Sequence, residues 1–177
     1  MADENKPIEL YGMTNKVMAE INAHILKHPD FCKFIYYTDA EYEDANILEQ
    51  DIVPVSEIYN KKFYVYKRFP ETIEEAGAYV FMNIYRNTPI TIGGKVNSIT
   101  FNVDILVHKD CLNTAHGNRV VCIYEALNEA ITDCANISAI GNINLTRILP
   151  ILGIVKDFEG YTVQYEAHTF KPRKLWK

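Results

Sequence analysis

The sequence predicts an α+β fold, a mostly antiparallel sheet of about four to five strands with two main helices packed on one face. Apolar and polar residues alternate over Ser98–Val107 and again over Tyr161–Phe170, which is the period of a strand with one buried face. Between them, Arg119–Asp133 carries apolar residues at helical spacing. Helices that cover one face of an antiparallel sheet make an α+β sandwich.

The length and composition predict one domain. The chain has 177 residues, of which 48% are hydrophobic, and that is enough for a single core. We expect this domain to cover 13–170, with a flexible N-terminal arm at 1–12 and a basic tail at 171–177. No apolar run reaches the roughly 18 residues that a membrane helix needs, and the polar N-terminus does not resemble a signal peptide.

The N-terminal part predicts two helices and a long connection. Thr14 is a plausible N-cap for a helix that extends to about Lys27. Asp30 is placed to cap a short second helix. The acidic insert at Ala40–Tyr59 is crowded with carboxylates and interrupted by Pro54, so we expect a partly helical connection there.

The middle of the chain predicts strands. Phe63–Arg68 is short and aromatic, and Ala78–Arg86 is rich in aromatic and β-branched residues. Gly93 and Gly94 mark the tip of a hairpin that leads into Ser98–Val107. Consecutive strands joined by short turns should pair antiparallel.

The C-terminal part predicts a helix over Arg119–Asp133 and then two strands. Ile143–Val155 is apolar but contains Pro150 and Gly153, so we expect an irregular or kinked strand. Asp157–Gly160 is expected to be a tight turn before the last strand.

Four cysteines show no C-x-x-C spacing: Cys32, Cys111, Cys122 and Cys134. Without a secretion signal we expect them to be reduced, and we expect Cys122 in the core. Metal-type residues cluster once, at His108, Asp110, Cys111 and His116. Their spacing matches no common zinc pattern, so a solvated loop without a metal is the expected structure, and no cofactor is expected.

One group of polar residues could carry acid–base chemistry. Asp104 lies on the polar face of its predicted strand, and Glu166 and His168 share the corresponding face of the last strand. Together they could act as acids and bases in a groove. The polar face of a half-exposed sheet, or a subunit contact, explains the same residues. No nucleophile, phosphate-binding or zinc-protease motif occurs.

The net charge of −5 is divided unevenly. Residues 1–60 carry twelve acids and four bases, and residues 61–177 carry eleven acids and fourteen bases. An acidic chain is a poor general binder of nucleic acid, because phosphate contacts need clustered Lys and Arg. The asymmetry fits either two solvated faces or oppositely charged surfaces that meet across a subunit interface.

The order of these elements resembles the tail terminator and neck-connector proteins of long-tailed bacteriophages. The resemblance covers roughly residues 75–170 and the first helix. Its recognisable half is a strand of the type F-x-V-x-I-x-V, here Phe101 to Val107, then the helix Arg119–Asp133 and a closing strand, here Y-T-V-Q-Y-E-A-H-T-F. The acidic insert at 40–59 is not part of this pattern.

The resemblance implies a structural virion protein without cofactor or catalysis. It implies a homohexameric ring that caps the tail tube and joins it to the neck, assembled in the host cytoplasm. The partners would be further copies of the chain, the tail tube protein and a neck or head-closure protein, with neither a membrane nor sequence-specific nucleic acid. The alternatives are another neck or head-completion connector, a ligand-binding or enzymatic domain using Asp104, Glu166 and His168, and an adaptor that binds one peptide.

A ring needs a heterologous interface, with two different surfaces on each subunit. Sheet edges that are exposed in the monomer could pair between neighbours. The charge asymmetry adds candidate contacts. The residues expected at this interface are Glu41, Glu43 and Asp44 against Arg68, Arg86, Arg173 or Lys174, with Trp176 in the tail as an aromatic docking residue.

Overall fold

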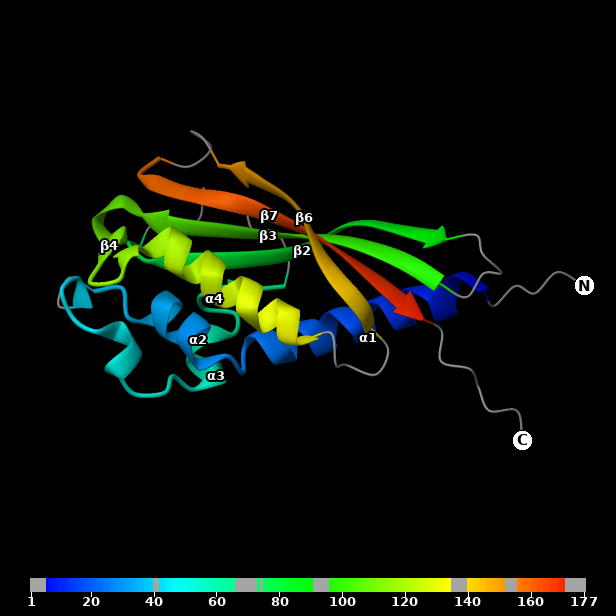
Figure 1. Cartoon of the computed structure of the whole chain (residues 1–177), viewed down its shortest axis with the longest axis horizontal. Coiled ribbons are helices and arrows are strands. Elements are labelled where there is room, and N and C mark those ends of the chain that lie inside the picture. Colours follow the sequence, from blue (N-terminus) through cyan, green and yellow to red (C-terminus); the bar gives the residue numbers. More distant parts are fainter. Residues whose placement is uncertain are drawn as a thin grey trace, which may run out of the picture.

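The computed structural model describes residues 6–39, 42–65, 73, 75–90, 96–134, 140–151 and 156–170. The helices are α1 (Lys6–Ile25), α2 (Pro29–Tyr36), α3 (Val55–Ile58) and α4 (Arg119–Asp133). The strands are β1 (Phe63–Tyr64), β2 (Ala78–Ile90), β3 (Val96–His108), β4 (Asn113–Thr114), β5 (Gly117–Asn118), β6 (Ile140–Pro150) and β7 (Phe158–Phe170). Long strands run along the molecule with the helices beside them (Figure 1).

The main sheet has five strands in the order β1-β2-β3-β7-β6, and β4 and β5 form a separate pair. The pairs β2–β3, β3–β7 and β6–β7 are antiparallel. The α+β prediction is therefore confirmed. One detail differs, because β1 pairs with β2 in parallel. A parallel pair needs a crossover instead of a tight turn, and the 13 residues of 65–77 separate the two strands in the sequence.

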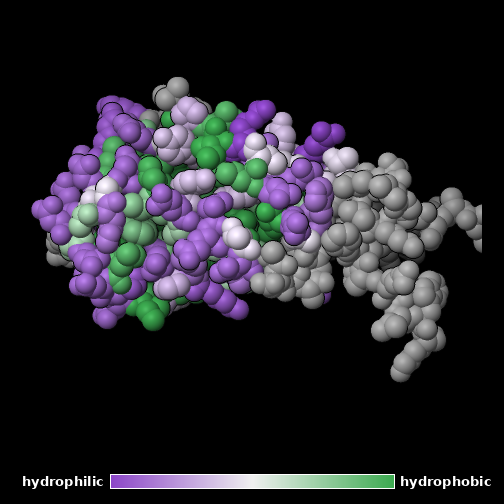
Figure 2. Space-filling view, viewed as in Figure 1, coloured by the Kyte–Doolittle hydropathy of each residue, from purple (hydrophilic) through white to green (hydrophobic). Residues whose placement is uncertain are grey.

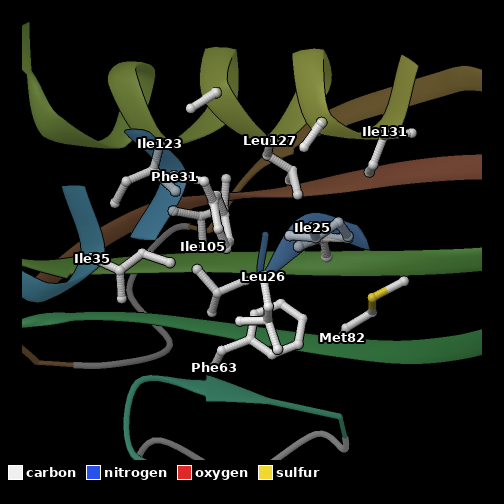
Figure 3. Packing of buried hydrophobic residues seen from close by; sticks show 14 of the residues in the cluster. Ile25, Leu26, Phe31, Ile35, Phe63, Met82, Ile105, Ile123, Leu127 and Ile131 are labelled. Atoms are coloured by element: carbon white, nitrogen blue, oxygen red, sulfur yellow. The ribbon is translucent and has the colours of Figure 1, made fainter. Parts of the chain in front are cut away.

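The core lies between the sheet and the helices. The five apolar residues predicted to share one face of β3 are at most 1% exposed: Ile99, Phe101, Val103, Ile105 and Val107. They pack in one cluster with residues of α1, α2, α4 and β7. Figure 3 shows Ile25, Phe31 and Leu127 converging on Ile105 from three helices. The alternation therefore identified the helix-covered face of the sheet correctly.

Helix α4 has the predicted bounds, and a capping hydrogen bond explains its start. The side chain of Asn118 accepts from the backbone N–H of Val120 at 2.9 Å, which satisfies one of the free donors of the first turn. Its apolar positions Val120, Ile123 and Leu127 are buried against the sheet.

The two N-terminal helices begin elsewhere than predicted. Helix α1 begins at Lys6 instead of Thr14, because nothing after Pro7 interrupts it and proline is tolerated in a first turn. Residues 6–12, expected in the arm, thus have helical backbone. Thr14 is buried inside α1, where its Oγ1 accepts from Asn87 Nδ2 of β2 at 2.7 Å. Helix α2 is capped by the His28 ring instead of Asp30.

The acidic insert is a partly helical connection, as predicted for its described part, 42–59. It contains one 3-10 turn at Ile47–Glu49 and the short helix α3. Pro54 does not end a helix there but stands at the N-cap of α3. The insert is attached to α2 by the buried Lys33, whose Nζ donates to the Leu48 carbonyl at 2.7 Å.

The strands also differ from their predicted ends. Strand β2 extends to Ile90, four residues past Arg86, and the Gly93–Gly94 tip lies outside the described residues. Strand β6 is irregular as predicted, with register shifts at 140/143 and at 145/147, but it spans Ile140–Pro150 instead of Ile143–Val155, and 152–155 lie outside the described residues. The turn before β7 is shorter than predicted, because Asp157 takes a positive φ of 65° and Phe158 already pairs with β3.

The four cysteines are free and buried. Burial raises the pKa of Cys32 from 9.0 to about 11 and that of Cys134 from 9.0 to about 12.

The stability of the protein should therefore depend on pH in the alkaline range. The unfolded chain loses these thiol protons at lower pH than the folded chain, so the free energy of unfolding should fall as pH rises above about 9. We expect the melting temperature to fall between pH 9 and 11, less so in a Cys134→Ala variant. Rapid alkylation of these thiols in the native protein at pH 8 would contradict their burial.

Candidate assembly surfaces

The face of the sheet opposite the helices carries a ladder of polar pairs. Thr162 Oγ1 donates to Asp104 Oδ1 at 2.6 Å, and Gln164 Nε2 donates to Asn102 Oδ1 at 3.0 Å. Further along, Ser98 Oγ donates to Glu166. At one end of this face a small apolar cluster gathers around Phe81 and Leu106. The polar side chains of β3 and β7 thus pair with one another across the two strands.

The proposed acid–base group does not form. Asp104 lies opposite Thr162, whereas Glu166 lies opposite Thr100, four residues along β3. At about 3.3 Å per residue this separates Asp104 from Glu166 by roughly 13 Å. His168 is two residues further, opposite Ser98. The shared strand face was predicted correctly, but the register places Asp104 too far away for one site.

The metal-type residues near His108 do not form a metal site either. Among the described residues, no group of three or more His, Cys, Asp or Glu can hold a metal ion. Cys111 is buried, and burial raises its pKa. His116 points elsewhere, to Asn46 Oδ1 at 2.8 Å, and its ring makes a T-shaped contact with the Phe34 ring.

Three of the expected interface residues are described, and all three are exposed. Glu43 and Asp44 lie in the insert, and Arg86 lies on β2. The others lie outside the described residues: Glu41, Arg68, Arg173, Lys174 and Trp176. Within the described part of the chain no helix is long and apolar enough to span a membrane.

A groove lies between α1, α3 and β2, and its volume is about 580 Å³. It begins beside Val65, where β1 has ended, and its lining is mainly apolar. The residues that line it are Asn15, Met18, Ala19, Asn22, Ala23, Leu26, Lys27, Val55, Tyr59, Val65, Met82, Asn83 and Ile84. We call it the α1–β2 groove. Such a volume is typical of a binding site for a small ligand or a short peptide.

One buried amide atom of a residue that lines the α1–β2 groove lacks a hydrogen bond to any described residue. It is Oδ1 of Asn22, an acceptor. A buried polar atom without a partner destabilises the chain that holds it. Asn83 Nδ2 also lacks a described partner, but Asn83 stands opposite Asn102, on the sheet face that points away from the helices.

Exposed apolar side chains lie at both edges of the sheet. At the β1–β2 edge, Val55, Tyr59, Val65 and Ile84 are between 36% and 45% exposed and all line the α1–β2 groove. At the other edge, Leu145, Ile148 and Leu149 of β6 are between 41% and 45% exposed; we call these three the β6 patch. Figure 2 shows green apolar side chains between the purple polar ones. Exposed apolar surface of this kind marks interaction sites.

Sequence reasoning missed the α1–β2 groove and also a buried arginine. Arg119 is 1% exposed, and its guanidinium donates to three backbone carbonyls. The distances are 2.6 Å from Nε to Cys111 and, from Nη1, 3.0 Å to Phe34 and 2.7 Å to Tyr37. A base in the first turn of a helix opposes the helix dipole, and that was the signal available in the sequence.

A protein-family model described as YomW matches residues 28–167. The matched range contains α2, α3, α4 and the sheet up to Ala167 of β7. A comparison with curated proteins found no match.

Proposed function

The chain belongs to the YomW family, whose phage-derived name indicates a phage-associated protein, and on this basis we propose that it is a tail terminator. In this proposal the chain forms a ring of about six copies that caps the tail tube and joins it to the neck. Its partners are further copies of itself, the tail tube protein and a neck or head-closure protein. It acts in the virion by assembly, without catalysis or a cofactor.

The observation that carries the proposal is the presence of two different exposed apolar surfaces at opposite edges of one sheet. The α1–β2 groove lies at one edge and the β6 patch at the other. A subunit with two unlike surfaces associates head to tail, and such contacts close into a ring when the rotation per subunit allows it. Glu43 and Asp44 against Arg86 stay the charged contacts that we propose for this ring.

A second observation favours assembly over chemistry. Asp104 and Glu166 each accept a hydrogen bond from a hydroxyl on the neighbouring strand, from Thr162 and Ser98 respectively. No two of the three proposed acid–base groups lie opposite each other in the register. A polar sheet face of this kind is suited to contact with another protein surface.

Light scattering after size-exclusion chromatography, together with negative-stain imaging, tests the proposal. We expect a closed ring of about six copies, either alone or on isolated tail-tube ends. Added to growing tail tubes, the protein should stop their elongation, because the ring covers the last tube subunits. A ring that binds only the neck would identify a connector instead. A monomer that neither binds tubes nor forms rings would contradict both assignments.

A further inference from the structure

We propose that strand β6 of one copy docks into the α1–β2 groove of the next copy and adds a strand to the open edge of β2. The inference rests on the proposed ring and names the joint between its subunits. It follows from four properties of the two edges: their unpaired backbone, their apolar side chains, the unsatisfied Asn22 amide oxygen of the groove and the charges of the flanking helices.

Both sheet edges have backbone that no described strand pairs. Strand β1 covers β2 only at Val80 and Phe81, so the outer side of β2 from Met82 to Ile90 has no partner strand among the described residues. Strand β6 pairs on one side only, with β7. Free N–H and C=O groups along a strand edge are a template for a further strand. Each copy thus has one edge, along β2, that can receive a further strand and one edge strand, β6, that can be added to another sheet.

Leu145 and Ile148 of the β6 patch lie on the same face of the sheet as Ile84, whereas Leu149, opposite Thr162, lies on the other face. Leu145 and Ile148 stand opposite Tyr165 and Val163, which belong to the core under the helices. Ile84 stands opposite Phe101 of the same core. A β6 strand added beside β2 therefore directs Leu145 and Ile148 under α1, into the groove that already contains Ile84.

The groove also supplies a hydrogen-bond acceptor that an extended chain can satisfy. Asn22 Oδ1 is buried there without a described partner. An incoming strand carries alternating N–H and C=O groups, so one of its N–H groups can donate to Asn22. An apolar helix face would leave this atom unsatisfied, which favours an extended strand as the occupant.

The charges of the flanking helices favour head-to-tail docking over self-pairing. Since α1 and α4 pack on the same face, docking β6 beside β2 brings α4 of one copy toward α1 of the next. The exposed charges of α4 are Glu125, Glu129 and Asp133, whereas 14–27 carries the exposed Lys16 and Lys27 and one half-buried acid, Glu20. Opposite charges meet in this arrangement, and like charges would meet if two β6 edges or two grooves paired.

Two single variants and their mixture test the joint. Ile84→Glu blocks the groove and leaves β6 intact, whereas Leu145→Glu blocks β6 and leaves the groove intact. We expect each variant alone to be a folded monomer by circular dichroism and light scattering. Mixed in equal amounts, they should form a dimer of one copy of each and nothing larger, because only one intact groove and one intact β6 can meet. Ile52→Glu, at a residue 78% exposed outside both surfaces, should assemble like the wild type.

If the wild type assembles only on tail-tube ends, the variants are compared with it on isolated tail-tube ends, and the measurement is whether a ring forms. Normal rings from Ile84→Glu or Leu145→Glu would overturn this joint while leaving the ring intact. A dimer formed by either variant alone would also overturn it, because that result shows like surfaces pairing. A wild type that forms no ring in any of these conditions would overturn the proposed function as well.

Discussion

Replacing Arg119 by methionine is expected to lower the free energy of unfolding by about 3–5 kcal/mol. Methionine fills a similar space, but it leaves the carbonyls of Cys111, Phe34 and Tyr37 without their donors. Hydrogen bonds to a charged group contribute about 1.5–3 kcal/mol each, and a buried acceptor left alone costs about 1–3 kcal/mol. Phe34 and Tyr37 stand at the end of α2, so the variant should also loosen the contact between α2 and α4.

Urea unfolding at one fixed protein concentration measures this loss. The control is Arg147→Met, which removes the same group from an exposed position on β6 and should change the stability by less than about 0.5 kcal/mol. Arg119→Lys should lie between the two, because an ammonium can bond some of the carbonyls but lacks the guanidinium fork. Equal stability of Arg119→Met and Arg147→Met would show that the buried guanidinium is not a structural clamp.

Replacing Gly160 by alanine should destabilise the sheet by about 3 kcal/mol or more. Gly160 pairs with Leu106 across β3 and β7, and a Cβ atom there would collide with the Ile105 carbonyl oxygen and lie 3.2 Å from Leu106 Cα. These are backbone atoms of the central strand, so no side chain can rotate away. The strands must separate, and the hydrogen bonds near the start of β7 should weaken.

Gly77→Ala is a matched control for this substitution. Its added Cβ would approach Lys62 Nζ at 2.7 Å, which is the end of a flexible side chain and can move at small cost. Thermal unfolding should therefore separate the two variants clearly. Hydrogen exchange should show faster exchange along β7 only in Gly160→Ala. A normal melting temperature for Gly160→Ala would mean that β3 and β7 are not packed as closely as described.

Much of the fold follows from local patterning. The alternation along β3 identified its buried face, and the helical spacing predicted the bounds of α4. Such patterns are reliable because burial on one face constrains every second or every third to fourth residue. The predicted start of α1 was wrong, because a capping residue is a weak signal for a helix boundary. Thr14 can cap a helix, but nothing in the preceding residues requires the helix to begin there.

The candidate surfaces were only partly accessible to such reasoning. Any antiparallel sheet has open edges that could pair between subunits. The sequence does not show which strands form those edges. Asp104 and Glu166 share a strand face in the sequence, and only the register of β3 against β7 separates them. Arg119 reads as a surface residue at a helix start until α2 is packed against it.

Periodicity within each segment was thus sufficient for the α+β class, the long β2–β3 hairpin and the core face, because each depends on neighbours in the chain. The lateral order of the strands is different. The placement of β7 between β3 and β6, the parallel pairing of the short β1 and the groove that its early end leaves beside β2 depend on contacts between residues far apart in the sequence. Those contacts compete for the same edges, and their outcome is set by the packing of all the elements together, which no single stretch of the chain encodes.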